Sequence, residues 1–256
     1  MHLAEWGAEL VGTMILVFGG LSAVVLDFHR GTPVARVIPS TSGRLLLTGA
    51  LFAATGSLVV ISPLGRRSGG HLNPAVTLAF WLTDHVHPHD LAGYCGAQLA
   101  GGLAGAALLR ATWGAEAAQV HDGITLPGPH TGAGQAAVIE AVMTAALVWT
   151  IFACVSSPRT ARWTPVAIWA LVTVEVWRVA PFTGTSLNPA RSLGPAVMSG
   201  DFHTFWVYVV GPLGGAAVAA GVWRLAPWRI LTAKLFHDPR YPSTLRSALP
   251  VRAEVA

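Results

Sequence analysis

Charged residues are scarce in this chain of 256 residues, where Asp, Glu, Lys and Arg together make up 11%. A soluble globular domain has about 25%, and a chain with so few charges could not cover its own surface in water. Hydrophobic residues make up 53%, and the mean hydropathy is +0.55. The composition therefore excludes an ordinary soluble protein and indicates one that lies in a lipid bilayer.

Cysteine is also rare. Cys95 and Cys154 both lie inside apolar stretches, so we expect buried free thiols rather than a disulfide or a metal site. His85, His87 and His89 stand close together in a polar turn, but no acidic or cysteine partners complete a tetrahedral shell around them. We therefore read them as loop residues and expect no metal and no cofactor. The sequence also lacks a nucleophile–base pair and a phosphate-binding glycine loop, so an enzyme is not expected.

The basic residues outnumber the acidic ones, 16 to 12, without forming a patch interleaved with aromatic side chains, so we expect no nucleic-acid partner. More of them fall on the side that would carry both chain ends, which predicts that both termini are cytoplasmic. The first apolar run begins with Glu5 and Glu9 and has no basic region before it. This pattern favours a retained helix over a cleaved signal peptide.

Six apolar stretches are long enough to cross a membrane, because a spanning helix needs about 20 residues. Two further apolar pieces are too short to cross, and each begins with the triplet Asn-Pro-Ala. We interpret these two as re-entrant half-helices. The six stretches are residues 7–27, 44–64, 90–110, 134–155, 163–181 and 203–224, and the short pieces are 73–82 and 188–198.

The chain contains an internal duplication. Its two Asn-Pro-Ala triplets are 188 − 73 = 115 residues apart, and Tyr94 and Tyr208 open similar segments 208 − 94 = 114 residues apart. We place repeat one at about 1–125 and repeat two at about 130–224, together a channel domain over 1–224, followed by a tail over 225–256. Three spans per repeat is an odd number, so the second repeat must insert upside down. Inverted repeats with broken helices are typical of a transport pathway whose key site lies at the midplane.

Each triplet, Asn73-Pro74-Ala75 and Asn188-Pro189-Ala190, is a favourable start for a helix. Asn caps a free backbone N–H group, Pro suits the first helical position, and Ala lets two such ends meet. The NH2 group of each capping Asn stays free to donate to a passing molecule. Each opposed helix end carries about half a positive charge, and with Arg191 these ends predict a barrier to protons and cations.

The segments that precede the triplets are irregular. Exposed backbone at membrane depth is tolerated only where it lines a water-filled cavity. We therefore predict a ladder of carbonyl acceptors at Gly69, Gly70, His71, Leu72, Gly184, Thr185, Ser186 and Leu187.

The motifs Ser68-Gly-Gly-His-Leu-Asn-Pro-Ala-Val76 and Asn188-Pro-Ala-Arg-Ser-Leu-Gly-Pro195 resemble those of the major intrinsic proteins, the aquaporins and aquaglyceroporins, most of all the nodulin-like branch. The resemblance covers roughly residues 6–224. It implies an all-α membrane protein with six transmembrane helices and two re-entrant half-helices in inverted repeats. It also implies a multi-pass protein of the cell membrane that forms a homotetramer, with one pore per subunit.

The resemblance further implies a passive channel that excludes protons and ions, with a selectivity filter of four residues on its outer side. These are Ala53, 20 residues before Asn73, then Val176 and Thr185, 12 and three residues before Asn188, and finally Arg191. The two longer spacings run through loops, so a shift of one residue, to Phe52 in place of Ala53, stays open.

Water-selective relatives usually have Phe and His at the first two filter positions, whereas Ala53 and Val176 are smaller and apolar. This difference favours glycerol, urea and metalloid hydroxides such as arsenous or boric acid, in addition to water. Glycerol channels often carry Asp after the filter Arg, and here Ser192 follows it. A water-selective channel and a non-conducting structural member of the family remain the alternatives.

Other ionisable residues have a structural and a functional interpretation. The resemblance implies that Glu9 and Glu140 are buried acids that accept N–H groups of the irregular segments, rather than a proton relay. We expect His71 to be a structural neighbour of its loop rather than a protonation gate. Glu175 and Arg178 are spaced to pair with each other along one helix.

Overall fold

The computed structural model describes residues 2–242 and 244–249. Within this part of the chain, six helices are long and apolar enough to cross a membrane. The six predicted spans are confirmed, with ends shifted by a few residues. These helices are α1 (Leu3–Phe28), α3 (Thr41–Ile61), α6 (Pro88–Trp113), α8 (Ala133–Val155), α9 (Thr164–Thr183) and α11 (Val207–Leu225).

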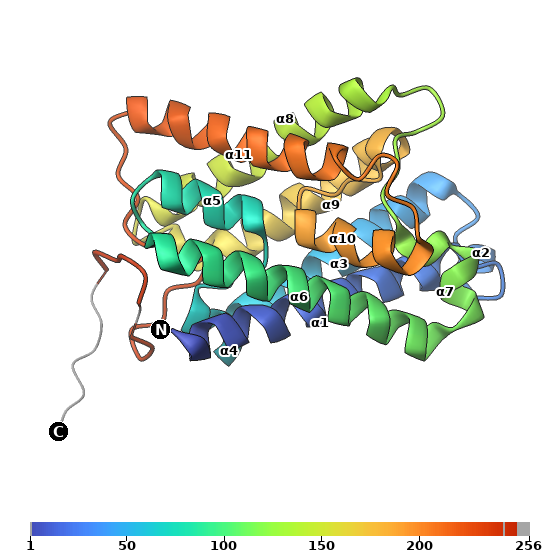
Figure 1. Cartoon of the computed structure of the whole chain (residues 1–256), viewed down its shortest axis with the longest axis horizontal. Helices are drawn as coiled ribbons and strands as arrows, with labels where there is room; N and C mark the ends of the chain where they lie inside the picture. Colours follow the sequence, from blue (N-terminus) through green and yellow to red (C-terminus); the bar gives the residue numbers. More distant parts are fainter. Residues whose placement is uncertain (1, 243, 250–256) are drawn as a thin grey trace.

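The two short apolar pieces are helices as well, α5 (Pro74–Leu82) and α10 (Pro189–Ser199). Figure 1 shows α5 toward the end of the bundle that carries the N-terminal residues, and α10 toward the opposite end. We call these the terminal end and the loop end. The remaining short helices connect the long ones: α2 (Val34–Val37), α4 (Pro63–Ser68), α7 (Ala115–Gln119), η1 (His121–Gly123) and η2 (Ala161–Trp163).

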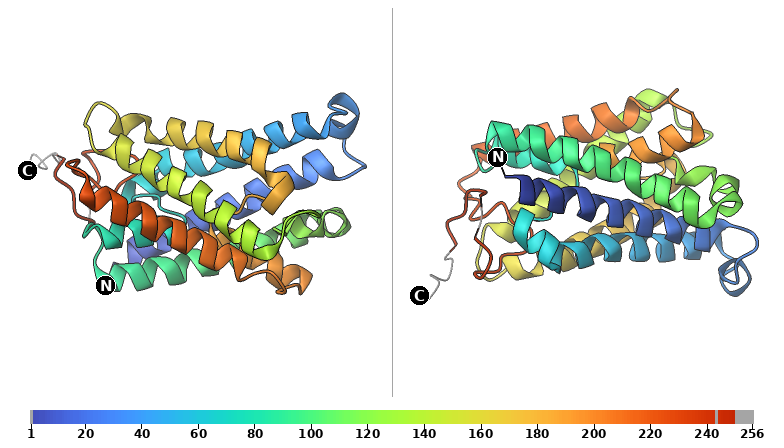
Figure 2. Two further views of the ribbon diagram at one scale, coloured as in Figure 1. Left: turned by 90° about the horizontal axis from the view of Figure 1, so that it is seen from above. Right: turned by 60° about the horizontal axis from the view of Figure 1, so that its bottom comes forward.

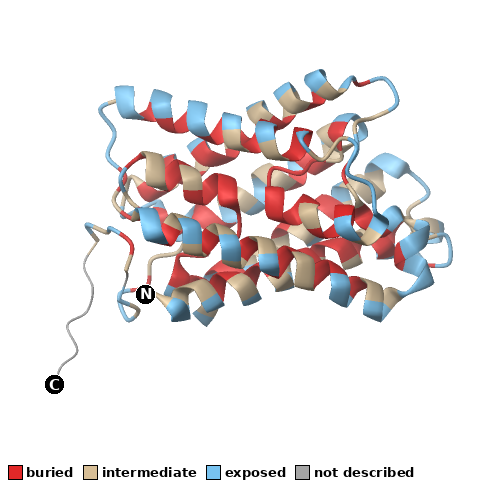
Figure 3. Cartoon of the chain, viewed as in Figure 1, coloured by how far each residue is buried: buried red, intermediate tan, exposed pale blue. Residues whose placement is uncertain are grey.

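The packing of the helices repeats the sequence duplication. In the first repeat α1 packs against α6 and α3, and in the second α8 packs in the same way against α11 and α9. The half-helices pack mainly across the repeats, α5 against α11 and α10 against α6. The views in Figure 2 show the long helices inclined around this centre, and Figure 3 shows that buried residues concentrate on the half-helices and the faces turned toward them. The two repeats therefore enclose one shared core.

Glycine makes the close approach of α10 to α6 possible. A Cβ atom at Gly102 would lie 2.1 Å from the Ala190 carbonyl oxygen, and one at Gly194 would lie 2.4 Å from the Gly102 carbonyl oxygen. Small residues at such crossings let helix backbones come together in a membrane. The position of the second triplet therefore depends on these two glycines.

We expect Gly102→Val to displace the second half-helix, because its side chain would overlap the backbone of Ala190. Overpacking of a tight core costs about 1–3 kcal/mol, so thermal stability in detergent should fall measurably. Gly96→Val on the same helix is the matched control, since nothing lies within 4 Å of a Cβ atom at Gly96. Equal stability of the two variants would contradict the close approach.

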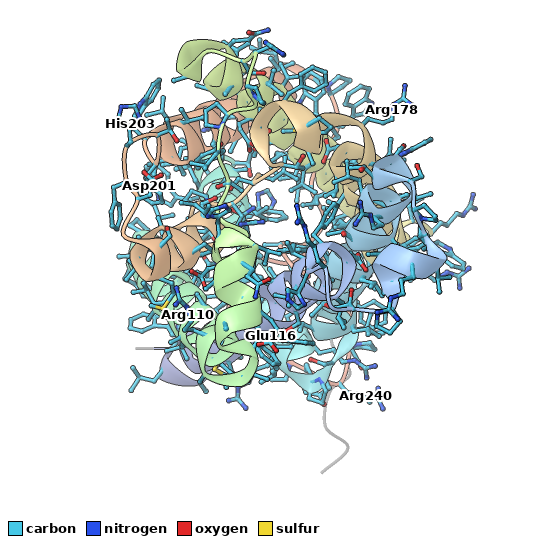
Figure 4. The ribbon with its side chains drawn as sticks, turned by 90° about the vertical axis from the view of Figure 1, so that its right-hand side faces the viewer. Arg110, Glu116, Arg178, Asp201, His203 and Arg240 are labelled. Carbon is cyan, nitrogen blue, oxygen red and sulfur yellow. The ribbon has the colours of Figure 1, made fainter. Side chains whose placement is uncertain are left out.

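Two expectations need correction. Cys95 and Cys154 are free, as expected, but half-buried rather than buried. Glu175 is buried, whereas Arg178 is exposed and its guanidinium lies 5.0 Å from the ring centre of Trp177. The predicted pairing of Glu175 with Arg178 is wrong, because the two side chains leave the helix in different directions and no ion pair joins them in the described structure. Figure 4, viewed onto the loop end, shows Arg178 pointing away from the centre of the bundle.

The segment after α11 does not extend away from the bundle. Its described residues, up to Leu249, fold back over the terminal end beside the N-terminal residues (Figures 1 and 2). Within them Thr232 and Ser247 form an isolated antiparallel bridge, so this segment has a defined path over that end.

Candidate functional site

The two Asn-Pro-Ala triplets begin the half-helices in the predicted way. Asn73 Oδ1 accepts a hydrogen bond from the Ala75 N–H group at 2.9 Å, and Asn188 Oδ1 accepts one from the Ala190 N–H group, also at 2.9 Å. Both Asn residues have extended backbone, and Pro follows each at the start of its helix. The sequence therefore sets both helix starts through local side-chain capping.

The amide groups of the two Asn residues also join the repeats. Asn73 Nδ2 donates to the Leu187 carbonyl at 2.8 Å, and Asn188 Nδ2 donates to the Leu72 carbonyl at 2.8 Å. The prediction that these NH2 groups are free is only half correct, because one hydrogen of each group is bonded to a carbonyl within the protein. Each NH2 group has two hydrogens, so one donor per Asn remains for a molecule in the cavity that both residues line.

The first irregular segment is held by Glu9 of α1. Its Oε1 atom accepts from the Ser68 hydroxyl (2.6 Å) and the His71 N–H group (3.1 Å). Its Oε2 atom accepts from the Leu72 N–H group (2.7 Å) and the Gln98 amide (2.8 Å). Glu9 is fully buried, so these four donors replace the water that a carboxylate would otherwise need.

Glu140 of α8 has the same task in the second repeat, but with fewer partners. Its two oxygens accept from the N–H groups of Ser186 (2.9 Å) and Leu187 (2.8 Å). The paired tyrosines also match, because Tyr94 donates to the Ser68 carbonyl and Tyr208 to the Thr183 carbonyl. These contacts agree with a structural interpretation of both buried acids.

The irregular segments adopt backbone conformations that turn successive peptide groups. Leu72, Thr185 and Leu187 have φ values of 52°, 52° and 58°, in the left-handed region that L-residues rarely adopt. Such conformations persist only where surrounding contacts hold them. Here the Glu9 and Glu140 carboxylates hold Leu72 and Leu187, and the Thr183 hydroxyl accepts from the Thr185 N–H group.

Three carbonyls of the predicted ladder already accept one hydrogen bond within the protein, which leaves each a second lone pair. The Gly69 carbonyl accepts the Leu235 N–H group at 2.9 Å, and those of Leu72 and Leu187 accept the Asn amides. Gly69 lines neither cavity described below, and its place in the ladder stays a prediction. The ladder residues that line the cavities are Gly70, His71, Leu72, Gly184, Thr185, Ser186 and Leu187.

Two cavities meet inside the bundle. The inner cavity, of about 100 Å³, is lined by Asn73 and Asn188. The outer cavity, of about 240 Å³, is lined by Gly123 of η1 and by Gly184, among other residues. The linings share five residues, which we call the junction: Phe52, Val172, Ser186, Leu187 and Arg191.

Arg191 is held at the junction by two contacts. Its Nη1 atom donates to the Gly123 carbonyl at 2.8 Å, and its guanidinium lies 5.4 Å from the ring centre of Phe52. Gly123 is positioned in turn by Arg110, which forms two hydrogen bonds with the Asp122 carboxylate. The spacing of Arg110 and Asp122 in the sequence did not reveal this support, because the intervening turn brings them together.

The structure brings three of the four expected filter residues together. Val176, Thr185 and Arg191 all line the outer cavity. Ala53 lines only the inner cavity, and the side chain beside Arg191 is that of its neighbour Phe52. The reason is space on α1: a Cβ atom at Gly20 would lie 2.5 Å from the Phe52 ring, so glycine there makes room for the ring.

The histidines have protein partners. His71 Nε2 donates to the Ala233 carbonyl at 2.8 Å, and its ring stacks on Phe80. His85 contacts the carbonyls of Thr83 and Ile230, and His87 is the residue before α6. His89 lies in the first turn of α6, not in a loop as we expected.

One cluster of donor atoms joins α1 to α6. The side chains of His2, His89 and Asp90 place one such atom each within 4.8 Å of one another. The buried Asp90 carboxylate already accepts from His2 (2.8 Å) and from the Trp6 indole (3.0 Å). These contacts bind the start of α1 to the first turn of α6.

Comparison with known proteins gives a consistent result. The model of the family described as "Major intrinsic protein" matches residues 2–223. "Probable aquaporin TIP2-2" of Arabidopsis thaliana is 36% identical, over 85% of this chain and 84% of its own length. "Lens fiber major intrinsic protein" of Gallus gallus is 35% identical (86% and 79%), and "Aquaporin NIP6-1" of Arabidopsis thaliana is 33% identical (86% and 67%).

A solved structure has a similar fold. The X-ray structure of the aquaglyceroporin from Plasmodium falciparum superposes with a TM-score of 0.73 at 19% identity, covering 87% of this chain and 96% of that one. At this identity the likeness concerns the fold alone.

Proposed function

The chain belongs to the major intrinsic protein family, whose members are passive membrane channels and not enzymes, and we propose that it conducts water together with small uncharged solutes. The solutes we propose are glycerol, urea and metalloid hydroxides such as arsenous or boric acid. The observation that carries this proposal is the pair of cavities that meet at the junction, with the two capping Asn residues in the inner one.

The lining of the cavities supports a passive pathway for neutral molecules. Among the described residues that line them, only His71 and Arg191 are ionisable, and none is an acid. A proton-coupled transporter needs ionisable groups along its path. Glu9 and Glu140, the paired acids of the two repeats, lie outside both linings and accept backbone N–H groups. Glu175, which is buried in α9, lies outside both linings too.

The junction suits molecules that carry both hydroxyl groups and carbon-bound hydrogen. Phe52 and Val172 supply apolar surface, as does Val176 in the outer cavity, whereas Ser186 and the Arg191 guanidinium supply polar groups. The Thr185 hydroxyl is buried without a hydrogen-bond partner in the described structure, and it lines the outer cavity. We propose that it bonds a solute hydroxyl or amide there.

Because the Phe52 ring lies beside Arg191, the proposed pathway is narrower there than it would be with the Ala53 side chain in that place. We propose that solutes larger than water pass because Val176 lacks the ring that water-selective relatives usually have at this position. A water-selective channel is the second candidate, and the observation that favours it is the contact of the Phe52 ring with Arg191.

Phe52→Ala should raise glycerol permeability, since it removes the ring beside Arg191. A change in steric fit of this kind alters a barrier by about 1–3 kcal/mol, so we expect glycerol permeability to increase about tenfold. Val176→His should lower glycerol permeability more than water permeability. Stopped-flow light scattering of proteoliposomes measures both rates. Leu51→Ala is the control, because Leu51 is exposed on the outer face of α3; parallel changes in all three variants would contradict the assigned junction.

The channel itself is tested with the unaltered protein. Proteoliposomes should shrink and re-swell faster than empty liposomes under water, glycerol and urea gradients, and a pH-sensitive dye inside them should report no added proton leak. Water flux without flux of any larger solute would support the water-selective candidate. Permeability equal to that of empty liposomes for every solute would support the non-conducting structural alternative.

We further propose that the protein is a homotetramer of the cell membrane with both termini cytoplasmic. The six spans support a multi-pass membrane protein. Exposed apolar residues on several spans, such as Leu58, Val142 and Val218, give faces for lipid or for neighbouring subunits. Light scattering of the detergent-purified protein tests the homotetramer. Protease protection of a tag after the C-terminus tests the cytoplasmic position of that end.

A further inference from the structure

The C-terminal segment covers the terminal end of the inner cavity. We call residues 230–242 and 244–249 the strap. Leu235 of the strap lines the same cavity as Asn73 and Asn188, although it lies far from them in the sequence. The strap is not one of the six spans, yet one of its side chains forms part of the proposed pathway.

The strap binds directly to the irregular segment that precedes the first triplet. The Leu235 N–H group donates to the Gly69 carbonyl at 2.9 Å, and the Ala233 carbonyl accepts from His71 Nε2 at 2.8 Å. Leu245 packs on the same place, since a Cβ atom at Gly69 would lie 2.8 Å from its Cδ1 atom. The strap thus occupies polar groups that would otherwise face the terminal entrance.

Lys234 fixes the strap with an unusually buried ammonium group. Its side chain is 1% exposed, and Nζ donates to the carbonyls of Arg66 (2.6 Å), Tyr241 (2.9 Å) and Pro242 (3.3 Å). Burial lowers the pKa of Lys234 to about 8. A buried ammonium is tolerated only where hydrogen bonds replace its hydration, so these three carbonyls and the lysine determine one another's positions.

Further contacts anchor the strap on several sides of the entrance. Asp238 pairs with Arg66 of α4 at 2.9 Å, and hydrogen bonds from Arg240 hold the pKa of the Asp238 carboxyl below its usual range. The Leu231 N–H group donates to the Val155 carbonyl at the end of α8. The Arg246 N–H group donates to the His85 carbonyl between α5 and α6.

Apolar contacts are present as well. Ile230, Ala233, Leu235 and Leu245 are buried and belong to the main apolar core, together with pore residues such as Leu72 and Leu187. Burial of a large aliphatic side chain stabilises by about 1.5–3 kcal/mol. The strap is therefore bound strongly enough to hold one position, but it is joined to the spans by a single connection after α11.

We propose that the strap is an autoinhibitory element that closes the terminal entrance of the pore, and that the channel conducts fully only when the strap is displaced. The geometry assigns Leu235 as the residue that blocks the inner cavity, and Lys234 as the residue that holds it there. This inference rests on the proposed channel function, and it adds a control of that function at the entrance opposite to Arg191.

Removal of the strap tests the proposal. A chain that ends at Arg229 should show water permeability per molecule about threefold or more above that of the intact chain. This is the increase expected if the displaced state is populated about a third of the time or less in the intact chain. A chain that ends at Leu249 keeps every described strap contact and is the matched control, with permeability expected to equal that of the intact chain.

Two point variants keep the proposal testable if the shortened chain does not fold. Lys234→Met retains the aliphatic stem and removes the donors, and Leu235→Ala removes most of the blocking side chain. Both should raise permeability. Hydrogen–deuterium exchange of the intact chain should show slow exchange at Leu235 and Leu231, and Lys234→Met should accelerate it.

The outcomes separate this inference from the channel assignment. Equal water permeability of the intact chain, the chain ending at Arg229 and both point variants would overturn the strap as an inhibitor while leaving the channel function in place. Fast amide exchange at Leu235 in the intact chain would overturn it too. Absence of conduction from all of them, for every solute, would contradict the channel function itself.

Discussion

Proteoliposomes that contain the Arg191→Val variant should leak protons or small cations that the unaltered protein excludes, while their water permeability stays the same or rises. We expect cation flux to increase about tenfold or more. A fluorescent pH indicator inside the vesicles and a potassium diffusion potential measure the leak, and stopped-flow light scattering measures water flux in the same preparation.

The expected effect follows from where the charge lies. Arg191 is the only cationic side chain shared by both cavity linings among the described residues, and it is 6% exposed. Repulsion between unit charges 4 Å apart at an effective dielectric constant of 20 is about 4 kcal/mol. Loss of about a third of this energy from a barrier raises a rate about tenfold. The half-helix ends keep their partial charges, so exclusion should weaken without disappearing.

Two further variants distinguish charge from structure. Arg191→Lys keeps the positive charge at the junction and should still exclude cations, although a lysine cannot reproduce the guanidinium contacts with Gly123 and Phe52. Arg178→Val removes a charge that points away from the bundle centre at the loop end (Figure 4) and should change neither flux. If Arg191→Val excluded cations as well as the unaltered chain, its role in the barrier would have to be abandoned.

The parts of the fold that follow from local patterns could be predicted from the sequence. Apolar runs of spanning length gave the six helices, because the bilayer requires that length of any helix. The capping chemistry of Asn73 and Asn188 gave the starts of both half-helices, because an Asn cap acts within three residues of itself. The duplication then gave the inverted arrangement without any knowledge of contacts.

What the sequence could not give depends on contacts between distant elements. Phe52, and not the expected Ala53, lies beside Arg191 because Gly20 of a different helix leaves room for its ring. Counting residues back from Asn73 cannot reveal such a contact between helices. The Asn73 amide uses one donor on Leu187, 114 residues away. The sequence predicts the strap only as part of a tail over 225–256, since its role depends on carbonyls that the fold gathers around Lys234.

The second large effect should come from replacing the buried acids, with a difference between the repeats. Glu9→Leu leaves four donors without their acceptor, whereas Glu140→Leu leaves two backbone donors. An unsatisfied buried donor costs about 1–3 kcal/mol. We therefore expect the free energy of unfolding to fall by about 2–6 kcal/mol in Glu140→Leu and by up to about twice that in Glu9→Leu. The larger loss approaches the whole stability of a domain, which is about 5–15 kcal/mol.

Thermal unfolding in detergent, followed by light scattering, measures this difference. Glu9→Leu should yield little folded protein, Glu140→Leu a folded channel with a lower Tm, and the Gln variants at both positions intermediate values, because Gln keeps one acceptor oxygen but adds two donors that the segment cannot pair. Glu116→Leu, on the exposed side of α7, should unfold like the unaltered chain. If Glu9→Leu proved as stable as Glu116→Leu, the left-handed backbone at Leu72 would not depend on this carboxylate, and the half-helix would have to be held in place by packing alone.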